Sequence, residues 1–131
     1  MGSAMSLERI QPAGLSKPPT YTHVIRAGNT VYIAGQTATD EQGQVVGKGD
    51  ITAQTTQVFE NLGKALAAVG ADFSRLVKIT VYLTDARFRE AVAQVRSRYL
   101  GQTLPTSTLV VVAGLASPDL LVEVEAVAVV E

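Results

Sequence analysis

A long β-strand is predicted for the segment Leu120-Leu121-Val122-Glu123-Val124-Glu125-Ala126-Val127-Ala128-Val129-Val130 near the C-terminus. Side chains alternate between the two faces of a strand, so the segment has two different sides. The first side is entirely apolar and holds Val122, Val124, Ala126, Ala128 and Val130. The second side mixes valines with acids and holds Glu123, Glu125, Val127, Val129 and Glu131.

The preceding segment, Leu109-Val110-Val111-Val112-Ala113, is apolar on both faces. Strands that are apolar on both sides are usually buried on both sides. The two helices predicted below can cover only one face of a sheet of this size. The other face then needs a partner, most simply another copy of the chain. The alternative is that these are central strands covered by loops.

The patterns in the rest of the sequence predict the order β-β-β-α-β-α-β-β. Gly28-Asn29 suits a tight hairpin turn between two β-branched runs. Asp50 and Asp85 are good helix N-caps, and Gly70 and Gly101 suit the helix ends. The expected strands span residues 7–11, 21–27, 30–36, 76–83, 108–113 and 120–130, and the expected helices span 51–69 and 86–100. In the fourth strand one face is expected to hold Val77, Ile79, Val81 and Leu83.

The composition of the 131 residues excludes several classes of function. There is no cysteine, which excludes disulfides and thiolate chemistry. A single histidine excludes a metal site built from several histidines, so no metal or other cofactor is expected. A net charge of −1 gives no field that would steer a polyanion, so nucleic acid is not favoured as a partner. No apolar run reaches the roughly 20 residues of a membrane helix, and we expect a cytoplasmic protein without membrane contact.

The length fits one domain, which we place at residues 6–131. Met1-Gly2-Ser3-Ala4-Met5 reads as a cloning remnant, and no signal peptide is visible. No linker or low-complexity tract divides the rest of the chain.

Five segments, in order and with fitting spacing, carry a resemblance to one protein family. They are Tyr21–Asn29, Val31–Gln36, Asp50–Thr55 with Asn61-Leu62, Val77–Asp85 and Val122–Ala126. On these segments the chain resembles the Rid family, also called YjgF or L-PSP, of reactive intermediate deaminases. The resemblance runs from about Tyr21 to the C-terminus.

The resemblance implies an α+β, chorismate-mutase-like fold, in which a curved mixed sheet carries two helices on one face. It also implies a homotrimer whose sheets form a central barrel, with small-molecule clefts between neighbouring subunits. The strands that are apolar on both faces independently favour self-association of the chain.

The family's best-known activity is the hydrolysis of enamines and imines such as 2-aminoacrylate to 2-keto acids and ammonia. Such a substrate needs a cation for its carboxylate, ideally a bidentate arginine. In the family this arginine follows Pro-Ala and precedes Ser, whereas here the segment reads Pro105-Thr106-Ser107-Thr108. Ser107 therefore stands at the arginine position, and Val92 stands where the family has an asparagine. The chain resembles an arginine-lacking subgroup, and we expect weak activity on 2-aminoacrylate because each charged hydrogen bond is worth roughly 1.5–3 kcal/mol.

The resemblance also implies the site residues. Glu123 matches the family's cleft glutamate and would be catalytic, orienting a water or accepting a proton. Substrate binding is implied for Tyr21, Gly35, Ser107 and Thr108. The structural alternatives are a barrel-lining charge for Glu123, a half-buried strand aromatic for Tyr21, a bulge at Gly35, and backbone-bonded hydroxyls for Ser107 and Thr108.

Other polar residues are better interpreted as structural. His23 can be a proton shuttle but is more typical of a strand histidine, and Glu125 shares the side of Glu123 as a barrel-lining charge. Arg87, Arg89, Arg96 and Arg98 resemble a solvated helix face rather than an RNA-binding surface, because no aromatic residues interleave with them.

Three hypotheses for the function remain. The first is a hydrolase or deaminase that acts on a small imine or enamine without a strict need for a carboxylate. The second is a non-catalytic trimer that binds a metabolite or another protein. The third and least supported is an endoribonuclease.

Overall fold

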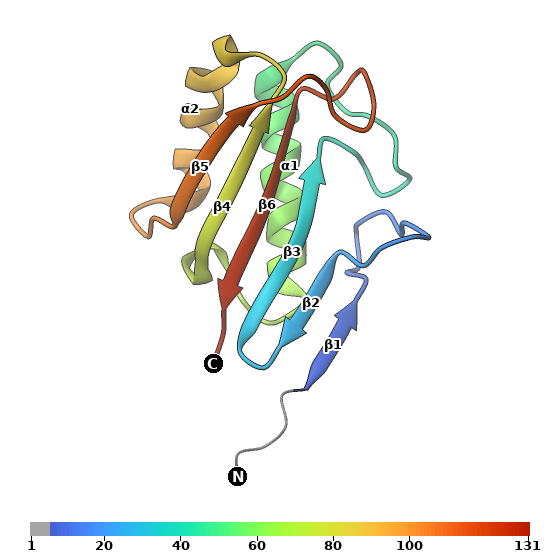
Figure 1. Ribbon diagram of the computed structural model, residues 1–131, viewed down its shortest axis with the longest axis vertical. Coiled ribbons are helices and arrows are strands. Elements are labelled where there is room, and N and C mark those ends of the chain that lie inside the picture. The colour runs from blue at the N-terminus through green and yellow to red at the C-terminus, as the bar shows by residue number, and fades with distance from the viewer. Residues whose placement is uncertain (1–5) are drawn as a thin grey trace.

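The closing segment forms the central strand of the computed structural model, which describes residues 6–131. This strand, β6, is antiparallel to both of its neighbours, β3 and β4. β5 runs parallel to β4 at one edge, so the sheet is mixed (Figure 1). The sheet has the order β1-β2-β3-β6-β4-β5, with bounds Leu7–Ile10, Val24–Ala27, Thr30–Thr37, Val122–Val129, Leu76–Leu83 and Thr106–Val111.

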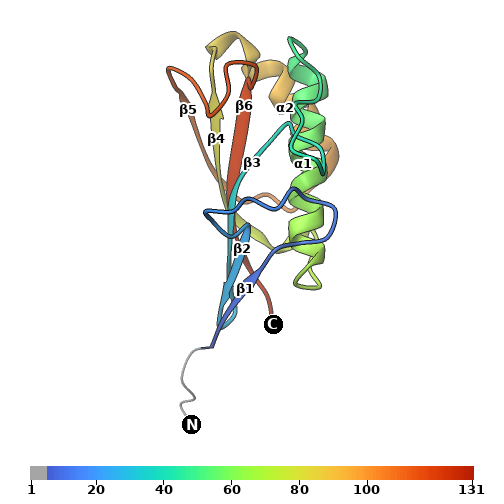
Figure 2. The same cartoon turned by 90° about the vertical axis from the view of Figure 1, so that its right-hand side faces the viewer.

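Two helices lie against one face of this sheet, as Figure 2 shows with the sheet seen edge-on. Helix α1 spans Ile51–Ala67, and the carboxylate of Asp50 accepts a hydrogen bond from the Ala53 amide at 3.0 Å, which confirms the expected N-cap. Helix α2 spans Arg89–Leu100. Asp85 caps a short 3₁₀ turn, η2 (Ala86–Phe88), so the expected helix begins as a tighter turn. A second 3₁₀ turn, η1 (Phe73–Arg75), precedes β4.

The core lies between the helices and the apolar side of β6. Val122, Val124, Ala126 and Ala128 are all buried, and they pack with α1 residues such as Phe59 and Leu62. Burying one large apolar side chain contributes about 1.5–3 kcal/mol, so this apolar layer stabilises the fold. The expected α+β fold with both helices on one face is confirmed.

One strand face differs from the prediction. Ile79, Val81 and Leu83 of β4 are buried as expected, but Val77 is exposed. The reason is a bulge in β4 between Leu76 and Lys78, where the pairing with β6 shifts register. The extra residue turns Val77 outward and lets Leu76 take the inward position.

The other boundaries differ from expectation by a few residues. Strand β2 begins at Val24 rather than Tyr21, so Tyr21 lies in the segment before the strand. Strand β5 begins at Thr106 and ends at Val111. The proposed cloning remnant, residues 1–5, lies outside the described residues. Across residues 6–131, each helix is too short or too polar to traverse a lipid bilayer.

The second face of the sheet, which we call the open face, has no helix against it in the described part of the chain (Figure 2). Apolar side chains from three different strands are exposed there, namely Tyr32, Val110 and Val129. That another copy of the chain covers this face stays a prediction from the sequence.

Candidate functional site

Glu123 lies on the open face in the middle of the sheet. Its cross-strand neighbours are Tyr82 on β4 and Thr37 on β3. The β3 side of this pairing is irregular, because Ile33 pairs with Ala126 while Gln36 pairs with Val124. Two residues of β3 therefore stand opposite one residue of β6, which is the geometry of a β-bulge.

Gly35 is in this bulge, and its lack of a side chain makes room for Glu123. A Cβ atom at position 35 would lie 2.7 Å from Glu123 Cδ and 2.9 Å from Cγ, and closer still to Oε2. Such distances are too short for any side chain, so the Glu123 carboxylate can rest on the β3 backbone only because residue 35 is glycine. The structure thus brings together Gly35 and Glu123, two of the residues that the sequence singled out.

The surroundings of Glu123 disfavour its charged form. The side chain is half-buried, and this burial is the main reason that its pKa is raised above the usual value. The nearby charge of Glu125 raises the pKa of Glu123 further. A glutamate with a raised pKa can both accept and return a proton nearer to neutral pH, which suits general acid–base work.

Glu125 shares the open face with Glu123, as strand alternation predicted. Its Oε1 accepts a hydrogen bond of 2.6 Å from the hydroxyl of Tyr82. This hydrogen bond is the main cause of the raised pKa of Tyr82. The sequence reasoning missed Tyr82, although the alternation in Lys78-Ile79-Thr80-Val81-Tyr82 places its polar members on one face of β4.

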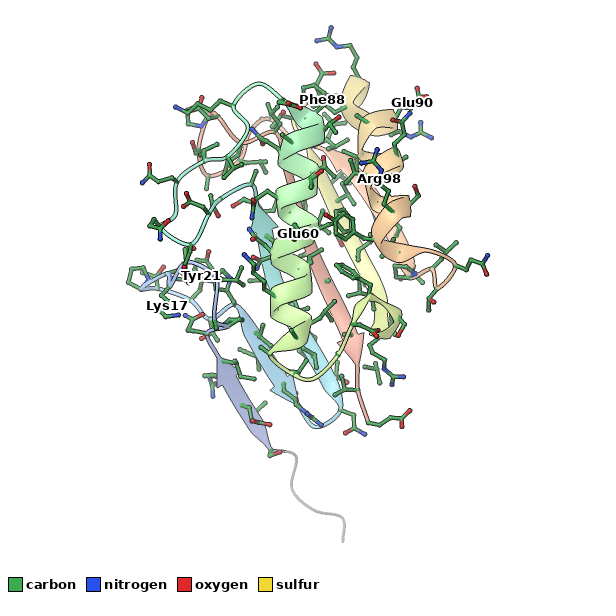
Figure 3. All side chains as sticks on the ribbon, turned by 180° about the vertical axis from the view of Figure 1, so that it is seen from behind. Lys17, Tyr21, Glu60, Phe88, Glu90 and Arg98 are labelled. Atoms are coloured by element: carbon green, nitrogen blue, oxygen red, sulfur yellow. The ribbon has the colours of Figure 1, made fainter. Side chains whose placement is uncertain are left out.

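Tyr21 lies just before β2 and is about half exposed. Figure 3 places it on the far side of α1 from α2. Its ring meets the ring of His23 edge-on, with centroids 5.7 Å apart. The amide of Ala34 donates to the His23 carbonyl at 2.8 Å, so the segment with Tyr21 runs beside the Gly35 end of β3.

His23 is buried and both of its ring nitrogens are engaged. Nε2 donates to the Ser16 carbonyl at 2.8 Å, and Nδ1 accepts from Gln36 Nε2 at 3.0 Å. These two hydrogen bonds tie the loop before β2 to β3. The geometry agrees with the structural interpretation of His23.

Ser107 and Thr108 point to opposite faces of the edge strand β5. Ser107 pairs with Ile79, whose side chain is buried under the helices, so Ser107 faces the helix side. Thr108 pairs with Thr80 and faces the open side. Both residues are exposed at the sheet edge. Within one chain, therefore, Ser107 does not share a face with Glu123.

The open face has a shallow hollow of about 150 Å³ beside Glu125, lined by Lys78, Thr80, Glu125, Ala126 and Val127. A larger hollow of about 500 Å³ lies next to α2 and is lined by Ala86, Arg87, Arg89, Glu90 and Ala93. The larger hollow contains none of the residues expected to act in catalysis or substrate binding. Pockets that bind small molecules usually measure about 300–1,000 Å³, so the open-face hollow of a single chain is small for a complete site.

Comparison with known proteins gives the same picture as the fold. The family model described as Endoribonuclease L-PSP matches residues 14–130. The chain is 36% identical to a mouse (Mus musculus) 2-iminobutanoate/2-iminopropanoate deaminase, over 83% of this chain and 80% of that one. It is 34% identical to the 3-aminoacrylate deaminase RutC of Acinetobacter baylyi, over 95% and 98%.

A solved structure agrees closely. The crystal structure of RidA from the Antarctic bacterium Psychrobacter sp. matches with a TM-score of 0.87 and 31% identity, over 94% of this chain and 99% of that one. The mixed sheet with two helices on one face is thus the architecture of Rid-type proteins. This chain belongs to that family, the Rid, YjgF or L-PSP family.

Proposed function

We propose that this protein hydrolyses a small imine or enamine, and that Glu123 positions the water and moves the protons. The observation that carries the proposal is the carboxylate of Glu123, half-buried and resting on Gly35 at a bulge in the sheet. Two relatives that are 36% and 34% identical to the chain over the aligned residues are named as deaminases of such compounds.

The chemistry consumes one water and proceeds through a carbinolamine. An enamine first gains a proton at carbon and loses one from nitrogen to give the imine, and water then adds to the carbon of the C=N bond. The Glu123 carboxylate accepts a proton from this water and passes it to the nitrogen, which gives a carbon that carries both a hydroxyl and an amino group. Glu123 then moves the hydroxyl proton to the nitrogen in the same way, the C–N bond breaks as the C=O bond forms, and the products are a carbonyl compound and ammonia.

The cleft that holds the substrate is formed between copies of the chain in this proposal. Ser107 and Glu123 of one chain face opposite sides of the sheet, so a pocket that contains both residues needs a second copy. The small size of the open-face hollow and the exposed apolar side chains around it support the same assembly, a homotrimer.

The proposed substrate lacks a strict requirement for a carboxylate. Ser107 offers one hydroxyl where the family has a guanidinium, and it cannot supply the charge or the planar pair of donors. Tyr21, Thr108 and the backbone at Gly35 complete the proposed binding surface. The two named deaminases act on different compounds, 2-imino acids and 3-aminoacrylate, so membership of the family leaves the substrate open.

The test is ammonia release from a panel of freshly generated imines, both with and without a carboxylate. We expect release from at least one neutral imine, and loss of that activity in Glu123→Gln. Glu60→Gln, a substitution on α1 far from the open face, is the matched control and should keep the activity (Figure 3). No release from any imine, together with ligands that still raise the melting temperature, would show a binding protein instead.

The role of Ser107 has its own experiment. Ser107→Arg restores the charge and should increase the rate on 2-aminoacrylate relative to neutral imines. If the rate on 2-aminoacrylate does not rise, the arginine is not the only element that this chain lacks.

Cleavage of RNA, which the family description mentions, is not part of the proposal. Arg87 on the α2 side is held by Asp85 at 2.7 Å, and Glu90 lines the same hollow. These acids reduce the positive charge that a phosphate backbone would need.

A further inference from the structure

The hydroxyl of Tyr82 and the carboxylate of Glu125 form the shortest hydrogen bond on the open face, at 2.6 Å. Tyr82 stands directly across from Glu123, and Glu125 stands directly across from Thr80. The bond therefore runs diagonally between β4 and β6 and fixes the position of the Glu125 carboxylate. Neither residue belongs to the set that the sequence reasoning assigned to the substrate.

We propose that Tyr82 and Glu125 are positioning residues that hold a fixed negative charge beside Glu123 and thereby set the pH range in which Glu123 works. The inference rests on the proposed function of Glu123. It adds two residues that need not touch the substrate.

The spacing along β6 makes this coupling effective. Glu123 and Glu125 are two residues apart on one face of a strand, so their backbones are separated by about 7 Å. A like charge at such a distance disfavours the ionised form of a half-buried carboxyl group. Glu125 is exposed in the single chain, so its side chain could take several rotamers. The hydrogen bond from Tyr82 selects one of them and so fixes where the Glu125 carboxylate lies relative to Glu123.

The other titratable groups on this face do not replace the pair. Lys78 on β4 lines the same hollow as Glu125, but it stands across from Val127, farther along β6 from Glu123. Tyr32 on β3 also stands across from Val127. Both lie beyond Glu125 as seen from Glu123, so Glu125 is the charged group nearest to Glu123 along this face.

The consequence is a glutamate that stays partly protonated closer to neutral pH. Burial alone already raises the pKa of Glu123, and the charge of Glu125 adds to this effect. The fixed charge thus favours the form of Glu123 that can return a proton to the departing nitrogen.

The experiment measures the ionisation of Glu123 directly and compares it with activity. Carboxyl-carbon NMR follows the titration of Glu123 in the full-length protein, with the signal assigned by its loss in Glu123→Gln. We expect Glu125→Gln to shift this titration to lower pH. Tyr82→Phe should shift it in the same direction by a smaller amount, because the charge remains but is no longer held in one position.

The kinetics should follow the titration. The acidic limb of the kcat profile should move to lower pH in both variants, with little change in KM. Tyr99→Phe is the matched control, because the Tyr99 hydroxyl donates to Glu60 at 2.8 Å on the other side of the molecule. This control should leave both the titration and the profile unchanged.

The outcomes separate this inference from the proposed function. If the Glu123 titration is unchanged in both variants, the positioning role is overturned, whether or not the protein hydrolyses imines. If the titration moves but the wild-type protein releases no ammonia, the proposed function fails while the electrostatic pair stands. If the titration moves and the acidic limb does not, Glu123 is not the group that limits the rate.

Discussion

Strand β6 contributes side chains to both faces of the sheet, and the two sets of side chains differ in character. On the helix side of β6, the side chains of Val122, Val124, Ala126 and Ala128 are buried against α1, and none of them is polar. On the open side, Glu123 and Glu125 lie two residues apart, and Val129 is exposed. The alternation of side chains lets one strand stabilise the chain on one face and hold titratable groups on the other.

The two faces also contribute differently to the stability of the fold. The helix side of β6 buries only apolar side chains, whereas the open side keeps a half-buried carboxyl group next to another acid. Such an arrangement lowers stability when both groups are charged, and strained or destabilised sites are often functional ones. Substitutions on the two faces should therefore have clearly different effects.

The largest effect on stability is expected on the helix side. Leu62→Ala removes a fully buried side chain of α1 and leaves a cavity next to β6. We expect a loss of about 2–5 kcal/mol in the free energy of unfolding. Urea denaturation at a fixed protein concentration measures this loss, and a value below 1 kcal/mol would contradict our description of the core.

The next effect is expected at Gly35, where the open face is most tightly packed. Gly35→Ala places a Cβ atom in the volume of the Glu123 carboxyl group and should cost about 1–3 kcal/mol. It should also abolish ammonia release, because the carboxylate is displaced.

A double-mutant cycle sharpens this prediction. In a Glu123→Ala background the methyl group has room, so the cost of Gly35→Ala should fall by at least about 0.5 kcal/mol. Equal costs in the two backgrounds would show that the glycine is needed for the bulge itself rather than for Glu123.

A smaller effect on folding is expected at the exposed apolar residues of the open face. Tyr32→Glu changes a side chain that is half exposed in the single chain, so the fold itself should change in stability by only about 0.5 kcal/mol. The same substitution should disrupt self-association. Ala67→Glu, at an exposed position of α1, is the control and should leave the assembly intact. Circular dichroism and light scattering distinguish the two effects.

The smallest effect is expected for Glu123→Gln, and its sign depends on pH. Because the pKa of Glu123 is raised in the folded protein, the ionised carboxylate costs stability above that pKa. Below the ordinary pKa of glutamate the group is neutral in both the folded and unfolded states, and the cost disappears. The variant should melt slightly higher than the wild type near pH 8, with the difference narrowing toward about pH 4. A difference that widens toward acid would contradict the raised pKa.

Much of this fold can be predicted from the sequence because it depends on short-range patterns. The alternation in residues 122–130 and the apolar spacing in residues 51–67 were enough to predict β6 and α1. The orientation of Val77 was predicted wrongly because it depends on a bulge, and a bulge has no clear signature in these residues. The segment with Tyr21 was extended into β2 for a similar reason, since its apolar pattern continues past the strand end.

The site was harder to predict because it depends on cross-strand register. Glu123 and Gly35 were named separately, but their contact joins two distant segments through a bulge. The hydrogen bond between Tyr82 and Glu125 likewise requires the register of β4 against β6. The resemblance singles out Ser107 as a candidate, and only its pairing with Ile79 shows which face it occupies.

The central claim is that copies of this chain cover the open face and so complete the site around Glu123. Native mass spectrometry at micromolar concentration tests it most directly. We predict a single species with three times the mass of the 13.8 kDa chain, which dissociates in Tyr32→Glu but not in Ala67→Glu. A wild-type protein that stays a monomer at every concentration would contradict the account.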